Sequence, residues 1–310
     1  MLQNILTVGE QVIILFILIF MGFAAGKRRL LNDTAATGMT NMVLYFVTPC
    51  VILNSFQRSY DPDMLFGLLL ATVAAFASHL VSICLSHFLV HDADEKRERV
   101  LKFATVFSNC GFMSLPLQQA LLGDAGVFYG AAYIAVFNIL AWSYGLYIMS
   151  RDKSLLSPRK ILFNPGVLPV LAGLILFFTS FQFPNIIAAP IRYMAALNTP
   201  VPMFLIGYYL SQANLAAVAK DRNCYWVMGL RLILSPLISL GLFYLCGLRG
   251  SVLIACMIAV CAPVAAMATM FADKFHQDTS VSVGLVSFST LLSVLTMPVI
   301  VGLTQTLAGG

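Results

Sequence analysis

Long apolar runs fill this sequence almost from end to end. A helix needs about 20 mostly apolar residues to cross the hydrocarbon core of a bilayer. Each run therefore predicts one membrane-spanning helix. Nine runs contain no Asp, Glu, Lys or Arg: Gln11–Gly26, Thr34–Gln57, Met64–His91, Phe103–Gly123, Ala125–Ser150, Ile161–Ile191, Tyr193–Ala219, Gly250–Ala272 and Thr279–Gly310. A tenth run, Asn223–Leu248, is interrupted only by Arg231.

The composition agrees with a chain whose main solvent is lipid. Of the 310 residues, 60% are hydrophobic and 10% are charged, where soluble domains have roughly 45–50% and about 25%. A soluble protein of this length could not bury so much apolar surface. The composition therefore excludes a soluble enzyme, a disordered protein and a nucleic-acid binder. We expect an all-α, multi-pass protein of the cell (inner) membrane, with the lipid bilayer as partner and no separate soluble domain.

Lys and Arg are distributed unevenly among the connections between the predicted helices. Connections after odd-numbered helices hold 14 of the 18 basic residues, those after even-numbered helices hold 3, and the last is Arg231. Because cytoplasmic loops carry the excess of Lys and Arg, the odd-numbered connections are expected in the cytoplasm and both termini outside. The net charge of +5 is then a topology signal and implies no acidic partner.

The second half of the chain repeats features of the first in the same order. Three matches lie 147 to 154 residues apart: Thr48-Pro49 with Thr199-Pro200, Pro116 with Pro263, and Asp124 with Asp278. A short loop, 151–160, would then separate a first five-helix unit, 1–150, from a second, 161–310. A unit with an odd number of spans enters the membrane from opposite sides in its two copies. This predicts the inverted repeat that is typical of secondary transporters.

Predicted helices four and nine carry signs of a broken backbone. Helix four contains Phe107-Ser-Asn-Cys-Gly-Phe-Met-Ser-Leu-Pro116, and helix nine contains Val260-Cys-Ala-Pro-Val-Ala-Ala266. Proline removes a backbone donor and glycine weakens a helix, whereas an ordinary proline kink is the alternative for either site alone. Broken backbone at this depth must lie inside protein or beside a water-filled cavity. The N–H groups of each half-helix carry partial positive charge, which suits a carboxylate.

Several motifs of the second half form a set: Arg231-Leu-Ile-Leu-Ser-Pro236, Gly247-Leu-Arg-Gly250, Pro263 and Phe271-Ala-Asp-Lys-Phe275. This set resembles the auxin efflux carrier family, and the resemblance covers essentially the whole chain. It implies a scaffold domain and a transport domain, helices four and nine crossing near the midplane, and often a homodimer. It also implies an organic anion as substrate, such as a mono- or dicarboxylate. By analogy, Asn109 would bind the carboxylate, while Pro116 and Pro263 shape the crossover.

The sequence departs from the plant auxin exporters of that family. Their long loop between helices five and six is here only 151–160, and a proline and a glutamine of their ninth helix are Ala268 and Val264. Auxin itself is therefore not the expected substrate. The candidate substrate-binding residues are Asn109, Cys110, Gly111, Pro116, Pro263 and Val264 at the breaks, with Thr48, Pro49, Asn138 and Arg231 as further candidates.

Three features of the spans leave alternatives open. Arg231 lies about 12 Å into its helix at 1.5 Å per residue, so it either attracts substrate or, as we favour, ties to carbonyls or a crossover helix. His79 is interpreted as a neutral packing residue, although a histidine there could relay protons. Gly22-Phe-Ala-Ala-Gly26 is a GxxxG pair that either packs two helices tightly or reflects general small-residue packing.

The sequence thus predicts a secondary transporter for a small organic anion that works by alternating access. No GxxxxGK[ST] motif occurs, so ATP drive within this chain is unsupported, and we expect no cofactor, metal site or disulfide. The alternative is a sodium- or proton-coupled symporter of the related bile-acid-transporter-like fold. An intramembrane enzyme and a channel are disfavoured, because no helix centre carries Asp or Glu and no repeated polar face indicates a pore.

Overall fold

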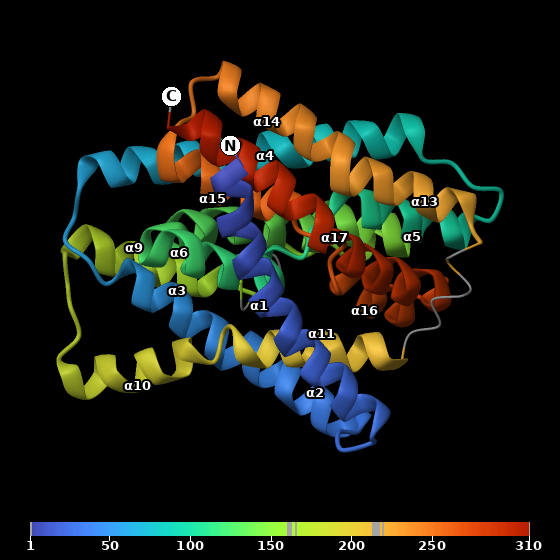
Figure 1. Cartoon of the computed structure of the whole chain (residues 1–310), viewed down its shortest axis with the longest axis horizontal. Coiled ribbons are helices and arrows are strands. Elements are labelled where there is room, and N and C mark those ends of the chain that lie inside the picture. The colour runs from blue at the N-terminus through green and yellow to red at the C-terminus, as the bar shows by residue number, and fades with distance from the viewer. Residues whose placement is uncertain (1, 160–162, 165, 213–217, 219, 310) are drawn as a thin grey trace.

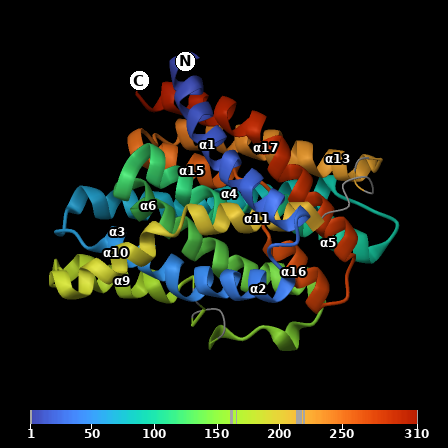
Figure 2. The same cartoon turned by 60° about the horizontal axis from the view of Figure 1, so that its bottom comes forward.

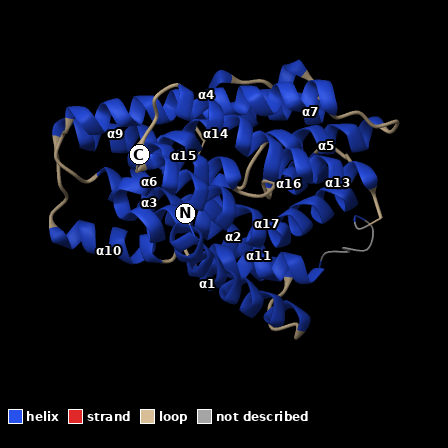
Figure 3. Cartoon of the chain, turned by 45° about the horizontal axis from the view of Figure 1, so that its top comes forward, coloured by secondary structure: helices blue, strands red, loops and turns tan. Residues whose placement is uncertain are grey.

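The computed structural model describes residues 2–159, 163–164, 166–212, 218 and 220–309. The predicted boundary between the short loop and the second unit, at Lys160 and Ile161, lies outside the described residues. Within the described residues every element is a helix or a helical turn, which confirms the all-α class (Figure 3).

In the first half of the chain, α-helices run directly into or out of π-helical turns, labelled η1, η2 and η3. Its elements are α1 (Leu2–Lys27), α2 (Asp33–Met42), η1 (Val43–Val47), α3 (Thr48–Phe56), α4 (Pro62–Leu89), α5 (Glu95–Val106), η2 (Cys110–Ser114), α6 (Leu115–Leu140), η3 (Ala141–Gly145), α7 (Leu146–Ser150) and the 3-10 turn η4 (Lys153–Leu155). The chain turns inside α6 at Gly123, whose φ of 61° favours glycine.

The second half is built in the same way. Its described elements are α9 (Leu168–Thr179), α10 (Asn185–Ala196), α11 (Pro200–Gln212), α13 (Arg222–Gly229), the π-helical turn η5 (Leu230–Leu234), α14 (Ser235–Leu245), α15 (Gly250–Cys261), α16 (Met267–Lys274) and α17 (Thr279–Ala308). Across the described residues, six helical stretches are long and apolar enough to cross a membrane, with two shorter apolar helices beside them. This count is below the ten predicted spans, since Cys110–Ser150 joins parts of two of them, while others are interrupted by short non-helical segments or extend beyond the described residues.

The long helices pack around one main hydrophobic core. In Figures 1 and 2, α1 crosses α11 and also runs against α17, while α4 lies beside α14 and α15. A second, smaller cluster joins α2 and α11 through Ala36, Val43, Leu205 and Tyr208. Both described ends of the chain lie near one another in these views.

Helices α1 and α11 touch backbone to backbone. A Cβ atom added at Gly22 would overlap the carbonyl oxygen of Phe204, and one added at Gly207 would overlap that of Ile19. Only glycine permits so close an approach. The tight-packing interpretation of the Gly22–Gly26 pair is therefore confirmed.

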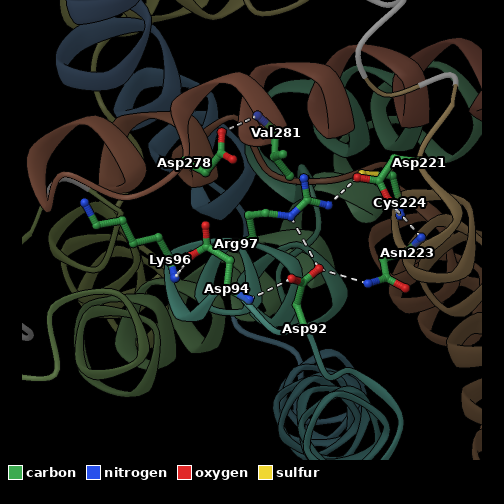
Figure 4. A network of polar contacts seen from close by, with 9 residues as sticks. All are labelled: Asp92, Asp94, Lys96, Arg97, Asp221, Asn223, Cys224, Asp278 and Val281. Atoms are coloured by element: carbon green, nitrogen blue, oxygen red, sulfur yellow. Dashed lines mark hydrogen bonds and ion pairs between the residues drawn. The ribbon is translucent and has the colours of Figure 1, made fainter.

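A charged network ties the start of α5 to the start of α13 (Figure 4). The Arg97 guanidinium donates to both Asp221 and Asp92, the latter at 3.4 Å, and Asn223 Nδ2 donates to Asp92 Oδ2 at 2.9 Å. Burial alone would raise the pKa of the Asp221 carboxyl, but its hydrogen bond to Arg97 and the charge of Arg97 outweigh that effect. The pKa of Asp221 therefore lies below its ordinary value.

The Arg97–Asp221 pair predicts a measurable but small coupling. In a double-mutant cycle of Arg97→Ala and Asp221→Asn, we expect a coupling free energy of about 1 kcal/mol or less, because both side chains remain partly exposed. Since the native pKa of Asp221 is depressed, the coupling is complete above the ordinary aspartate value of about 4, declines below it, and is lost as the pH falls through the lowered native pKa. Unfolding measured at pH 7 and pH 3 tests this, and an equal coupling at both pH values would contradict it.

Candidate functional site at two crossing helix breaks

Two helices are interrupted where the sequence predicts broken backbone. Helix α5 ends at Val106 because Phe107 is extended (φ −102°, ψ 118°), and helical geometry resumes at η2. Helix α15 ends at Cys261, followed by extended Ala262 (φ −60°, ψ 147°), and the next helix, α16, begins at Met267. The predicted breaks are therefore present in both segments.

The two breaks lie against each other and share their hydrogen bonds. Ser108 and Val264 form a single antiparallel bridge. The Asn109 N–H donates to the Pro263 carbonyl at 2.7 Å, and the Ala265 N–H donates to the Phe107 carbonyl at 2.9 Å. Each break thus supplies the backbone partners that the other has lost, which buried polar backbone requires.

Pro116 does not interrupt the first segment. It lies in the first turn of α6, several residues after the break at Phe107–Asn109. Proline is tolerated there because this first turn directly follows the π-helical turn η2, where the regular α-helical hydrogen bonds are already interrupted. Pro263 does lie inside its break, where its carbonyl accepts the Asn109 bond and its missing N–H costs nothing. The two repeat-related prolines therefore act differently.

The turn after the first break carries buried polar groups without partners. The side-chain nitrogen of Asn109 and the hydroxyl of Ser114 are buried and have no hydrogen-bond partner in the described part of the chain. Cys110 is buried, and a Cβ added at Gly111 would meet no atom within 4 Å. An unused amide donor and open space thus lie within three residues of each other.

A cavity of about 310 Å³ lies between α3, α6 and α10. Small-molecule sites have roughly this size or more. Its polar lining residues are Asn54, Gln119, Asp124, Arg192, Asn198 and Thr199. Of the sequence candidates, buried Thr48 lies one helical turn before the lining residue Val51 on α3, with half-buried Pro49 beside it. Sequence reasoning missed Arg192, which lies in a predicted connection, and Asn198, which lies in a predicted span, because nothing local marks either as facing a cavity.

Arg231 is 1% exposed and contacts both broken helices. Its guanidinium donates to the carbonyls of Thr105 and Val106, at 3.5 and 3.4 Å, and to those of Val260 and Ala262, the latter at 3.3 Å. The favoured interpretation, a tie to crossover carbonyls, agrees with these contacts.

Two other polar candidates make local contacts. Asn138 donates from Nδ2 to the Ile134 carbonyl at 2.9 Å and lies against Gly166, and neither contact involves the breaks. His79 is buried, with Nδ1 2.7 Å from the Ala75 carbonyl, and its ring packs near aromatic rings such as that of Tyr133. These contacts agree with a packing role for His79.

Comparison with known proteins decides the family. The family model described as "Membrane transport protein", which represents the auxin efflux carrier family, matches residues 7–301. The chain belongs to this family. An uncharacterized transporter of Methanothermobacter thermautotrophicus is 24% identical over 295 residues, covering 93% of this chain and 96% of the relative. An uncharacterized transporter of Methanocaldococcus jannaschii is 22% identical over 300 residues, covering 92% and 95%. The auxin efflux carrier family consists of transporters, so this protein is a membrane transporter and not an enzyme.

Proposed function

We propose that this protein is a secondary carrier for a small organic anion that works by alternating access. In this proposal the ten predicted spans form two inverted units, 1–150 and 161–310, and the anion binds beside the crossing breaks. The membership in a transporter family and the paired breaks in corresponding positions of the two halves support it. The substrate is expected to be a mono- or dicarboxylate.

The observation that carries the proposal is the unused donor of Asn109. An amide N–H buried without a partner costs about 1–3 kcal/mol, so a native protein keeps one only where something compensates. A carboxylate oxygen is a suitable acceptor, because it has no donor of its own when ionised. The first N–H groups of η2, which continues directly into α6, add partial positive charge beside the break.

The packing on either side of the breaks supports an access route from one face. Phe112, in η2, packs against the small cluster of Val43, Leu205 and Tyr208 between α2 and α11. The 310 Å³ cavity lies between α3, α6 and α10 and is lined by Arg192. In the proposed orientation, Phe112 would belong to the closed cytoplasmic side and the cavity to the outer entrance. Arg192 would then attract anions to the outer entrance.

A ligand screen on the purified protein tests the proposed substrate class. We expect at least one mono- or dicarboxylate to raise the melting temperature and to produce a current on a solid-supported membrane. Neutral amide analogues of the same acid serve as the matched control and should do neither. If none of a broad set of carboxylates acts, while neutral or cationic solutes do, the anion proposal is wrong.

Cysteine labelling tests the orientation. In a cysteine-free background, Ser154→Cys in the predicted cytoplasmic loop should not react with an impermeant maleimide in intact cells. Gln182→Cys should react promptly, because the structure ends α9 at Thr179, before the predicted end of the sixth span, and leaves this exposed residue in the loop that follows, on the proposed outer side. After the cells are opened, both should react. Prompt reaction at Ser154→Cys in intact cells would reverse the orientation.

A further inference from the structure

Arg231 binds the two broken helices at equivalent points. Helix α5 ends at Val106 and helix α15 ends at Cys261. The guanidinium reaches the last carbonyls of α5 through one nitrogen, Nη1, and carbonyls at the end of α15 through Nε and Nη2. It therefore joins the C-terminal ends of both half-helices in a single buried cation.

Both of those helix ends are electrically negative. The unsatisfied carbonyls at the C-terminus of a helix carry about half a negative charge, and here two such ends meet in the interior. Arg231 has no ion-pair partner among the described residues. A buried charge without compensation is very costly. Here the backbone carbonyls compensate the charge of Arg231, and no carboxylate does.

Other carriers built on broken helices fill such a place with a mobile ion. There, unwound carbonyls and half-helix C-terminal ends coordinate the coupling Na⁺ or H⁺. A guanidinium presents several N–H donors in a fixed plane and stays charged in proteins. It satisfies several carbonyls at once, as a dehydrated sodium ion would.

We propose that Arg231 is a tethered substitute for a coupling cation at the crossover, so that the transport cycle does not use sodium. This inference rests on the proposed carrier function and separates it from the alternative of a sodium-coupled symporter. The carbonyls of Thr105, Val106, Val260 and Ala262 form a cage that already binds a permanent positive charge. A sodium ion therefore does not bind in this cage, and a sodium gradient does not drive the cycle. The positive charge also stays with the breaks in every state of the carrier.

Replacement of sodium tests the wild-type protein directly. Exchanging Na⁺ for choline at constant ionic strength should leave both the melting temperature and the anion current unchanged. A sodium-dependent rise in either quantity, at concentrations where potassium has no effect, would overturn the proposal.

Chemical rescue tests the role of Arg231 itself. Arg231→Ala should lower the melting temperature by about 10 °C, since several buried carbonyls lose their cation. Free guanidinium at about 10 mM, well below denaturing concentrations, should restore much of the loss by binding the native state. Arg192→Ala, which removes an exposed arginine, is the matched control and should show neither the loss nor the rescue. Sodium is expected to rescue Arg231→Ala in part, because the emptied cage offers the same carbonyls.

The rescue result does not depend on the substrate. If wild-type protein transports no carboxylate but guanidinium still rescues Arg231→Ala, the carrier proposal fails and the cation role of Arg231 stands. If Arg231→Ala does not fold, Arg231→Lys keeps the charge and should retain more stability than the neutral Arg231→Met. Equal stability of the lysine and methionine variants, or no rescue of a folded alanine variant, would overturn the proposal.

Discussion

Replacing Asn109 by alanine is expected to lower the affinity for the transported anion by about 10- to 100-fold. A hydrogen bond from a neutral donor to a charged group contributes about 1.5–3 kcal/mol, and each 1.4 kcal/mol corresponds to a factor of ten. The side-chain amide of Asn109 donates no hydrogen bond within the described structure. The whole loss should therefore appear in ligand binding.

The stability of the same variant distinguishes a binding role from a structural one. The break is held by the backbone N–H of Asn109, which bonds Pro263 whatever the side chain is. Without ligand, Asn109→Ala should therefore melt close to the wild type. The control is Asn223→Ala, which removes an amide that bonds Asp92 and should leave anion affinity unchanged. Titrations by thermal shift and transport current measure both. Unchanged affinity in a folded Asn109→Ala protein would remove Asn109 from the site.

The sequence predicts the helical class and the location of both breaks, because membrane helices and their interruptions leave strong local signals. Apolar length marks the spans, and Ser108-Asn109 and Pro263 stand out against a leucine-rich background. The first break lies at the start of the predicted stretch and not at Pro116. Its residues become extended at Phe107, a residue without any helix-breaking chemistry, because the partner segment supplies hydrogen bonds to Phe107 and Asn109. Tertiary pairing of this kind cannot be read from one segment.

Contacts between distant segments explain what else the sequence does not predict. Asp92 and Arg97 bond to Asn223 and Asp221, which lie more than 120 residues away in the sequence, so these ties depend on how α5 and α13 meet. Arg192 is predicted in a connection, but it lies in α10 and becomes a lining residue because α3 and α6 approach that helix. Arg231 was singled out by its charge inside a span, whereas its carbonyl partners follow from the crossing of the breaks.

Replacing Gly207 by alanine is expected to destabilise the protein strongly, because the added methyl group has no room between two helix backbones. The new Cβ would overlap the Ile19 carbonyl oxygen, and it would lie 2.7 Å from the backbone nitrogen of Phe23. Both obstacles are backbone atoms of α1, so no side chain can rotate away and the helices must separate. Overpacking usually costs about 1–3 kcal/mol and occasionally more. We expect about 3 kcal/mol or more here, with α1 released from α11.

Gly241 provides the matched control for this effect. It lies in α14, is exposed, and has no atom within 4 Å of an added Cβ. Gly241→Ala should be neutral or stabilising by up to about 1 kcal/mol, because alanine favours the helix. Both variants make the same chemical change, so their difference in unfolding free energy isolates the contact between the two helices. Gly22→Ala, which meets the Phe204 carbonyl from the other side, should resemble Gly207→Ala. If Gly207→Ala instead melts like Gly241→Ala, helices α1 and α11 do not approach as closely as described.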